Sequence, residues 1–252
     1  MENNQKFIPG IYNWCDRWCE RCPQTDRCRV YEREEDRKKN YPEKDWAEVV
    51  ADNFAETLQM LQKMAEEMGL DLDSEEVKEE TAAQMALEEA QEVIAENHPL
   101  HELSEKYWKK GKAWLDSPLL KEKVLQWKSM VELGVMDLDL AESNLRMADE
   151  AMEVINWYLF FIPVKIKRAL HDQMDSFWDQ YPDEERSDLG TAKIASIAID
   201  RSIGAWGMLF KLFSEQEEVV EILAILEKMR RGLIEVFPNY PKFIRPGFDD
   251  QP

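Results

Sequence analysis

The stretch LDLAESNLRMADEAMEVINWYLFFIPVKIKRAL, residues 138–170, decides the fold of this 252-residue chain. Its apolar residues recur every seven positions along two columns, and together the columns form the seam of a helix packed in a bundle. The first column is Leu138, Leu145, Met152, Leu159 and Ile166, and the second is Ala141, Ala148, Ile155, Ile162 and Ala169. Large apolar residues also lie outside the seam, so we expect neighbouring helices to cover this segment on several sides. These residues are Trp157, Phe160, Phe161 and Val164.

The rest of the chain shows the same helical spacing. Six further helices are expected, over residues 45–68, 74–97, 99–114, 118–134, 191–213 and 215–237. Glycine is scarce, with nine in the whole chain, which favours helices over a turn-rich β architecture. The sequence therefore predicts an all-α fold, a bundle of about six or seven helices with an N-terminal four-cysteine metal loop.

Composition also suggests three parts along the chain. Residues 1–40 form a cysteine-rich, metal-binding arm, and residues 41–236 form the helical bundle. The final part, residues 237–252, contains too many prolines for a helix and too many aromatic residues for free solvent. We expect this tail to dock on the bundle.

The charge distribution limits the partners. The chain has 32 Lys and Arg against 52 Asp and Glu, a net charge of −20. Residues 1–40 are nearly balanced, whereas between Glu66 and Glu105 the only Lys or Arg is Lys78. Such a surface repels the phosphates of nucleic acids and anionic lipids. The sequence thus argues against nucleic-acid and membrane partners, leaves a protein partner open, and does not define the oligomeric state.

The N-terminal residues bear on the compartment. The first ten, MENNQKFIPG, are polar and lack the apolar core of a secretory signal, and no later segment has the composition of a membrane span. We therefore expect a cytoplasmic protein. In that reducing compartment, clustered cysteines are more often metal ligands than disulfides.

All four cysteines of the chain lie in the stretch CDRWCERCPQTDRC, residues 15–28. The candidate ligands, spaced C-x3-C-x2-C-x5-C, are Cys15, Cys19, Cys22 and Cys28. Thiolates are soft ligands that suit zinc and iron–sulfur clusters, and four of them complete either kind of site. Such a site carries a charge of about −2 with either metal, which nearby arginines would offset. These are Arg17, Arg21, Arg27 and Arg29.

The second half of this loop suggests which metal binds. Cys19, Cys22 and Cys28 give C-x2-C-x5-C, with Pro23 directly after the second cysteine. This half resembles the iron–sulfur loop of the helix–hairpin–helix DNA glycosylases, although Cys15 stands closer to Cys19 than the corresponding pair in that family. The resemblance covers the loop alone and implies a four-iron, four-sulfur (4Fe–4S) cluster. It does not imply glycosylase activity, because no catalytic motif of that family is visible.

Two functions follow from the loop. In the first, the chain is a cytoplasmic iron–sulfur protein that transfers electrons or senses redox state. In the second, the metal is structural zinc and the acidic helical bundle is a scaffold or adaptor without catalysis. Structural zinc sites usually combine two C-x2-C pairs, and only one pair is present, so we favour iron–sulfur. The sequence leaves open whether the protein is an enzyme.

Charged residues also occur on otherwise apolar helix faces. Glu153 and Arg201 would each be costly to bury alone, so we expect them to form a buried pair, directly or through Asp200. The alternative is a carboxylate metal site in the bundle, formed by Glu56, Glu150, Glu153 and Asp200. The Glu-x-x-His motif of ferritin-like di-iron proteins is absent from the sequence. His98 and His101 are expected to cap or to be solvated rather than to bind metal.

Overall fold

A computed structural model describes residues 6–40, 45–72, 74–213 and 216–249. These residues contain eight α-helices and five short 3-10 helices, and no β-strand is found among them. The all-α prediction is therefore confirmed. The chain forms two compact units, which are described separately. Whether residues 1–40, 41–236 and 237–252 behave as separate domains stays a prediction.

The N-terminal unit comprises Met1–Tyr12 and Cys19–Glu92. It contains the 3-10 helices η2 (Cys19–Arg21) and η3 (Thr25–Arg27), followed by helices α1 (Arg29–Asn40), α2 (Trp46–Met68) and most of α3 (Glu75–Glu96). The N–H of Ile8 donates to the carbonyl oxygen of Arg27 at 3.0 Å, and Lys6 forms an ion pair with Glu32. These bonds fold the residues before η1 (Ile11–Asn13) back along the cysteine loop and α1.

Local sequence signals set the ends of α2. The Asp45 side chain accepts from the N–H of Glu48 at 2.8 Å, and the Glu48 carboxylate accepts from the N–H of Asp45, which completes a capping box. The helix ends at Gly69, whose φ of 69° lies in the left-handed region that glycine adopts without strain. The expected boundaries of this helix are confirmed. Its apolar face is nevertheless exposed, with Phe54 65% accessible.

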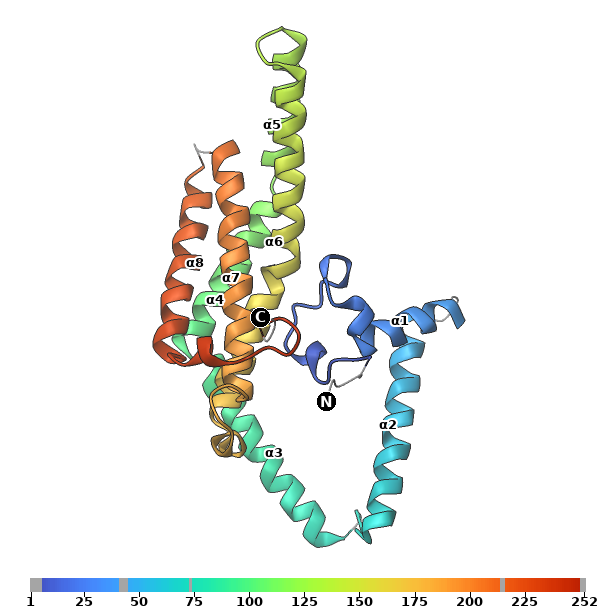
Figure 1. Cartoon of the computed structure of the whole chain (residues 1–252). Coiled ribbons are helices and arrows are strands. Elements are labelled where there is room, and N and C mark those ends of the chain that lie inside the picture. The colour runs from blue at the N-terminus through green and yellow to red at the C-terminus, as the bar shows by residue number, and fades with distance from the viewer. Residues whose placement is uncertain (1–5, 41–44, 73, 214–215, 250–252) are drawn as a thin grey trace. The chain divides into compact units, whose positions relative to one another are not determined.

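The bundle unit comprises Asn13–Trp18 and Val93–Pro252. Its helices are α4 (Pro99–Leu115), α5 (Leu119–Glu132), α6 (Leu138–Gln173), α7 (Ser187–Leu212) and α8 (Glu217–Val236). Helices α6 and α7 share the largest interface, while α4 packs on α6 and α8, and α7 packs on α8. Within this unit, the N-terminal half of α6 extends beside α5, beyond the ends of α7 and α8 (Figure 1).

The core lies where α4, α6, α7 and α8 meet. The second column of α6 is buried from Ala148 onward, as the seven-residue repeat predicts. Opposite it, α7 contributes small buried residues, which allow the two helix axes to approach closely. These are Ala192, Ala195, Ala198, Ser202 and Ala205. Gly111 of α4 has the same effect, since a Cβ there would lie 2.6 Å from Cδ1 of Leu159.

One expectation about α6 is wrong. Trp157, Phe160 and Val164 were expected to be covered by neighbouring helices, but they are 36%, 63% and 46% exposed. The helices that pack on α6 cover its seam, whereas this outer face has only partial contacts, from Trp18 on Trp157 and from Trp108 of α4 on Phe160. Leu138 and Leu145, at the start of the first column, are also exposed because α6 extends past the bundle there.

The tail returns across α7. Phe243 is buried, the Lys193 ammonium donates to its carbonyl oxygen at 2.6 Å, and the N–H of Ile244 donates to the carbonyl oxygen of Glu184 at 3.1 Å. Gly190 of α7 creates the space for this packing. A Cβ at Gly190 would lie 2.6 Å from the Phe243 ring and 2.7 Å from the Trp14 ring.

Candidate metal centre

The segment that contains Cys15 is fixed to the bundle through Asp16. Its carboxylate accepts a hydrogen bond from the Tyr158 hydroxyl and forms an ion pair with Arg201, and its carbonyl oxygen accepts from Trp157 Nε1 at 3.0 Å. Trp18, 6% exposed, stacks on Trp157 with ring centroids 5.0 Å apart. Four contacts to α6 and α7 therefore hold residues 13–18 in place.

The protonation of this network is set by burial. Burial raises the pKa of the Tyr158 hydroxyl, and the neighbouring Asp16 carboxylate raises it further. Tyr158 thus stays protonated and donates a hydrogen bond to the carboxylate. Arg17 follows with φ at 59°, a left-handed conformation that is uncommon for a residue other than glycine. The contacts on either side of Arg17 compensate for the strain of that turn.

The expected buried pair of Glu153 and Arg201 is wrong. Both residues are exposed, so neither charge has lost its contact with water. The Arg201 guanidinium instead forms its ion pair with Asp16, and Asp200 lies 3.8 Å from Arg230. No local pattern indicates the contact between Arg201 and Asp16, because 185 residues separate the two.

Lys165, on helix α6 of the bundle, lies close enough to Cys15 for the two charges to interact. Burial lowers the pKa of its ammonium, and the charges of Arg168 and Arg17 lower it further, whereas the charge of a Cys15 thiolate opposes the shift. Its Nζ also lies 5.2 Å from the centre of the Phe161 ring. No pattern in the sequence singles out Lys165, because the residues next to a lysine in the chain do not show which distant residues it will contact.

The other three cysteines belong to the N-terminal unit. Cys19 begins η2, Cys22 follows it, and Cys28 follows η3. The N–H of Cys22 donates to the carbonyl oxygen of Cys19 at 3.1 Å, and the N–H of Gln24 donates to Cys22 Sγ at 3.4 Å. Backbone donors of this kind stabilise thiolates and tune the metals that they bind.

The donor set fits a soft metal in its chemistry. All four cysteines are partly exposed thiols that form no disulfide in the described chain. Across the described ranges, no group of three or more His, Cys, Asp or Glu side chains is arranged as a metal site. Binding of a soft metal by cysteine thiolates is commonly coupled to local folding of the segment that carries them.

The alternative carboxylate site in the bundle has no support. Its four candidates were expected to project inward, but Glu56, Glu150, Glu153 and Asp200 are all exposed. In ferritin-like bundles the carboxylates that bind metal face the bundle interior. We therefore regard these carboxylates as surface groups.

The two neighbouring histidines have structural roles. Nδ1 of His98 accepts from the N–H of Leu100 at 3.1 Å and so caps α4, which confirms the expected capping role. Burial lowers the pKa of His98, and the nearby His101 lowers it further. Nδ1 of His101 lies 3.0 Å from the carbonyl oxygen of Glu96.

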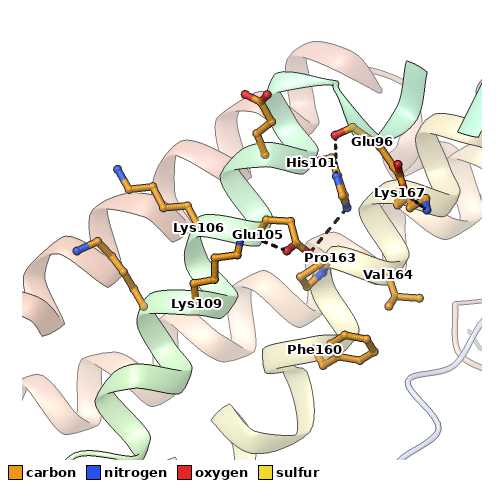
Figure 2. Close-up of a pocket in the computed structure, with 11 residues that line it drawn as sticks. Glu96, His101, Glu105, Lys106, Lys109, Phe160, Pro163, Val164 and Lys167 are labelled. Atoms are coloured by element: carbon orange, nitrogen blue, oxygen red, sulfur yellow. Dashed lines mark hydrogen bonds and ion pairs between the residues drawn. The ribbon is translucent and has the colours of Figure 1, made fainter. Parts of the chain in front are cut away.

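A surface pocket of about 700 Å³ lies between α4 and α6 (Figure 2). One wall is apolar and the other charged, and the lining residues include Phe160, Pro163, Val164, Glu96, Glu105, Lys109 and Lys167. Most of these charges already have partners: Lys167 Nζ lies 2.7 Å from the Glu96 carboxylate, and Lys109 Nζ lies 3.9 Å from that of Glu105. The pocket therefore does not define the chemistry of a ligand.

Comparisons of this chain with protein-family models, with curated proteins and with solved structures found no match. Among the described helices, none combines the length and the apolar character required to cross a bilayer.

Proposed function

We propose that this chain is an iron–sulfur protein whose 4Fe–4S cluster is held by Cys15, Cys19, Cys22 and Cys28, and that it transfers electrons or senses redox state in the cytoplasm. The observation that carries the proposal is the cysteine loop. It gathers every cysteine of the chain within fourteen residues, and all four remain thiols. Four thiolates are the ligand set that a four-iron cluster takes up.

The loop has features that suit this role. The N–H of Gln24 that donates to Cys22 Sγ is the kind of hydrogen bond that tunes the reduction potential of a cluster. The four flanking arginines and Lys165 supply positive charge, which favours the more negative reduced state. When bound, the cluster would supply one-electron chemistry, and with four cysteine ligands each iron would be fully ligated.

The contacts of Asp16 support the same proposal from the side of the bundle. Together with the packing of Trp14 on Phe243 they fix the residues on both sides of Cys15, so this ligand is held by the helical bundle rather than by a loose arm. Trp18, three residues after Cys15, is buried and stacks on Trp157, which gives this segment apolar cover. Apolar cover of this kind restricts water, and solvent exposure is one of the factors that set cluster potentials.

Anaerobic purification followed by metal and sulfide analysis tests the proposal. The expected protein is brown, contains about four irons per chain when intact, and bleaches with dithionite. Cys22→Ser should lose most of the iron, whereas Thr25→Ala, a loop substitution that changes no ligand, should keep it. Iron at the wild-type level in Cys22→Ser would exclude Cys22 as a ligand.

The second candidate function is a zinc-stabilised acidic scaffold or adaptor without catalysis. It rests on the same four thiols, because zinc also accepts four cysteine ligands. The same purification separates the two proposals. A colourless protein with one tightly bound zinc per chain would overturn the iron–sulfur proposal and favour the scaffold.

A further inference from the structure

Helix α2 carries an apolar seam, with Thr57 as its one polar member, that is exposed along its length. The spacing between its residues alternates between four and three, as at the core positions of a coiled coil. They are Val50, Phe54, Thr57, Leu61, Met64 and Met68, and every one of them is exposed. Leu58 and Met60, 44% and 59% exposed, widen the seam on its two sides. An apolar surface of this length marks an interaction site rather than ordinary surface variation.

The charges of α2 are arranged to leave this seam clear. The outer positions of the helix hold Glu48, Asp52, Glu56, Lys63 and Glu66. The positions that flank the seam are Ala51, Asn53, Leu58, Met60, Ala65 and Glu67. The only charge among them is Glu67, whose carboxylate lies 3.8 Å from Lys63 Nζ of the same helix. Two such helices can therefore meet without repulsion between like charges, although the chain carries −20.

This charge pattern disfavours the other classes of partner. A helix that lies on a membrane presents Lys and Arg on its polar face, whereas α2 has five acidic residues and one lysine. A basic protein partner would find only Glu67 beside the seam, and Lys63 already neutralises it. The seam lacks a partner with an apolar surface and few flanking charges, and the α2 helix of a second copy has both properties.

We propose that α2 is a self-association helix, on which the α2 helix of a second copy of this chain docks in the antiparallel direction. A two-fold symmetric contact uses the same surface on both copies, and the α2 seam is complementary to itself in this direction. The seam spans residues 50–68, about 28 Å of helix at 1.5 Å per residue. This inference is independent of the metal that the cysteine loop binds.

The antiparallel register follows from side-chain size. In this register three kinds of contact join a seam residue of one copy to a seam residue of the other, and the two-fold symmetry repeats each of them. Two of the contacts pair a smaller residue with a larger one, and the third pairs an aromatic residue with a flexible one. They are Val50 with Met68, Phe54 with Met64, and Thr57 with Leu61. In the same register Glu67 faces Asn53, whose amide can donate to it, and Met60 faces Met60 of the second copy. No pair of like charges occurs at any of these positions.

Sedimentation equilibrium of the full chain, in reducing buffer and over a range of concentrations, tests the association. We expect a reversible dimer. Leu61→Glu places a charge in the centre of the seam and should raise the dissociation constant by at least about 100-fold. Gln62→Glu adds the same charge one residue away, on the outer face, and should change it by less than about threefold. A monomer at all concentrations, or a dimer unaffected by Leu61→Glu, overturns the proposal.

Met60 tests the direction of pairing. Because it faces its own copy in the antiparallel register, Met60→Lys and Met60→Glu should each impair the dimer by repulsion between identical charges. An equimolar mixture of the two variants should form a heterodimer through attraction between opposite charges. The far-ultraviolet circular dichroism of each variant checks that α2 remains helical. A mixture no more associated than either variant alone overturns the antiparallel contact.

Discussion

Helices α2 and α6 have similar apolar repeats and different surroundings. In α6, Ile155 and Ile162 of the seam are fully buried against other helices of the bundle. In α2, Phe54 and Leu61 occupy equivalent positions of a seam and remain more than half exposed. The burial of an apolar side chain of this size contributes about 1.5–3 kcal/mol. A seven-residue repeat thus identifies the face of a helix that needs an apolar neighbour, and it does not say whether the same chain supplies that neighbour.

Truncation of one seam residue in each helix should give the largest difference between the two helices in the free energy of unfolding. Ile155→Ala removes atoms from a filled core and should lower the free energy of unfolding by about 2–5 kcal/mol. Phe54→Ala, at a concentration that keeps the chain monomeric, should change it by less than about 0.5 kcal/mol. Urea unfolding followed by tryptophan fluorescence and circular dichroism measures both. Equal losses would mean that α2 is covered within the monomer.

Two glycines of α7 allow the same comparison within a single helix. Gly190 touches the Phe243 and Trp14 rings, so Gly190→Ala should overpack this contact and cost about 1–3 kcal/mol. At Gly204 no atom beyond the adjoining turns of its own helix lies within 4 Å of an added Cβ, and Gly204→Ala should stabilise the helix by about 0.5–1 kcal/mol. Thermal unfolding measures both shifts. If Gly190→Ala is neutral, the tail and the Trp14 segment are not packed on this residue.

The smallest effect concerns the cap that His98 provides for α4. Its lowered pKa means that the folded state favours the neutral imidazole, which accepts the N–H of Leu100. The contribution of this cap to the stability of the folded state is therefore complete at pH values above the unfolded pKa of about 6.5. It is lost as the pH falls from that value through the lower pKa of the folded state. The loss should be about 0.5–2 kcal/mol, the usual contribution of a cap.

Stability measured at several pH values between 8 and about 5 would show this loss, and NMR titration of His98 would locate its pKa directly. His98→Asn should retain the cap and remove this part of the pH dependence, because an amide does not titrate in that range. A pH profile unchanged in His98→Asn would assign the titration to another group.

The sequence by itself indicated seven of the eight helices in the described residues, and it placed their ends well where those ends depend on local chemistry. Asp45 with Glu48 begins α2 and Gly69 ends it, through bonds between residues that are close in the chain. The second column of α6, from Ala148 to Ala169, was also visible, because a seven-residue repeat needs no knowledge of the partner helix. The cysteine loop was evident for the same reason, since its four thiols lie within fourteen residues.

Only the tertiary structure decided which apolar faces and which charges are covered. Trp157, Phe160 and Val164 remain partly exposed on a face of α6 that its neighbours contact only in part, and nothing in their own spacing distinguishes that face from a buried one. Arg201 contacts Asp16 rather than forming the expected buried pair with Glu153, because the fold brings a segment near the N-terminus against α6 and α7. Contacts between distant residues depend on how the helices pack, and helical periodicity carries no information about that packing.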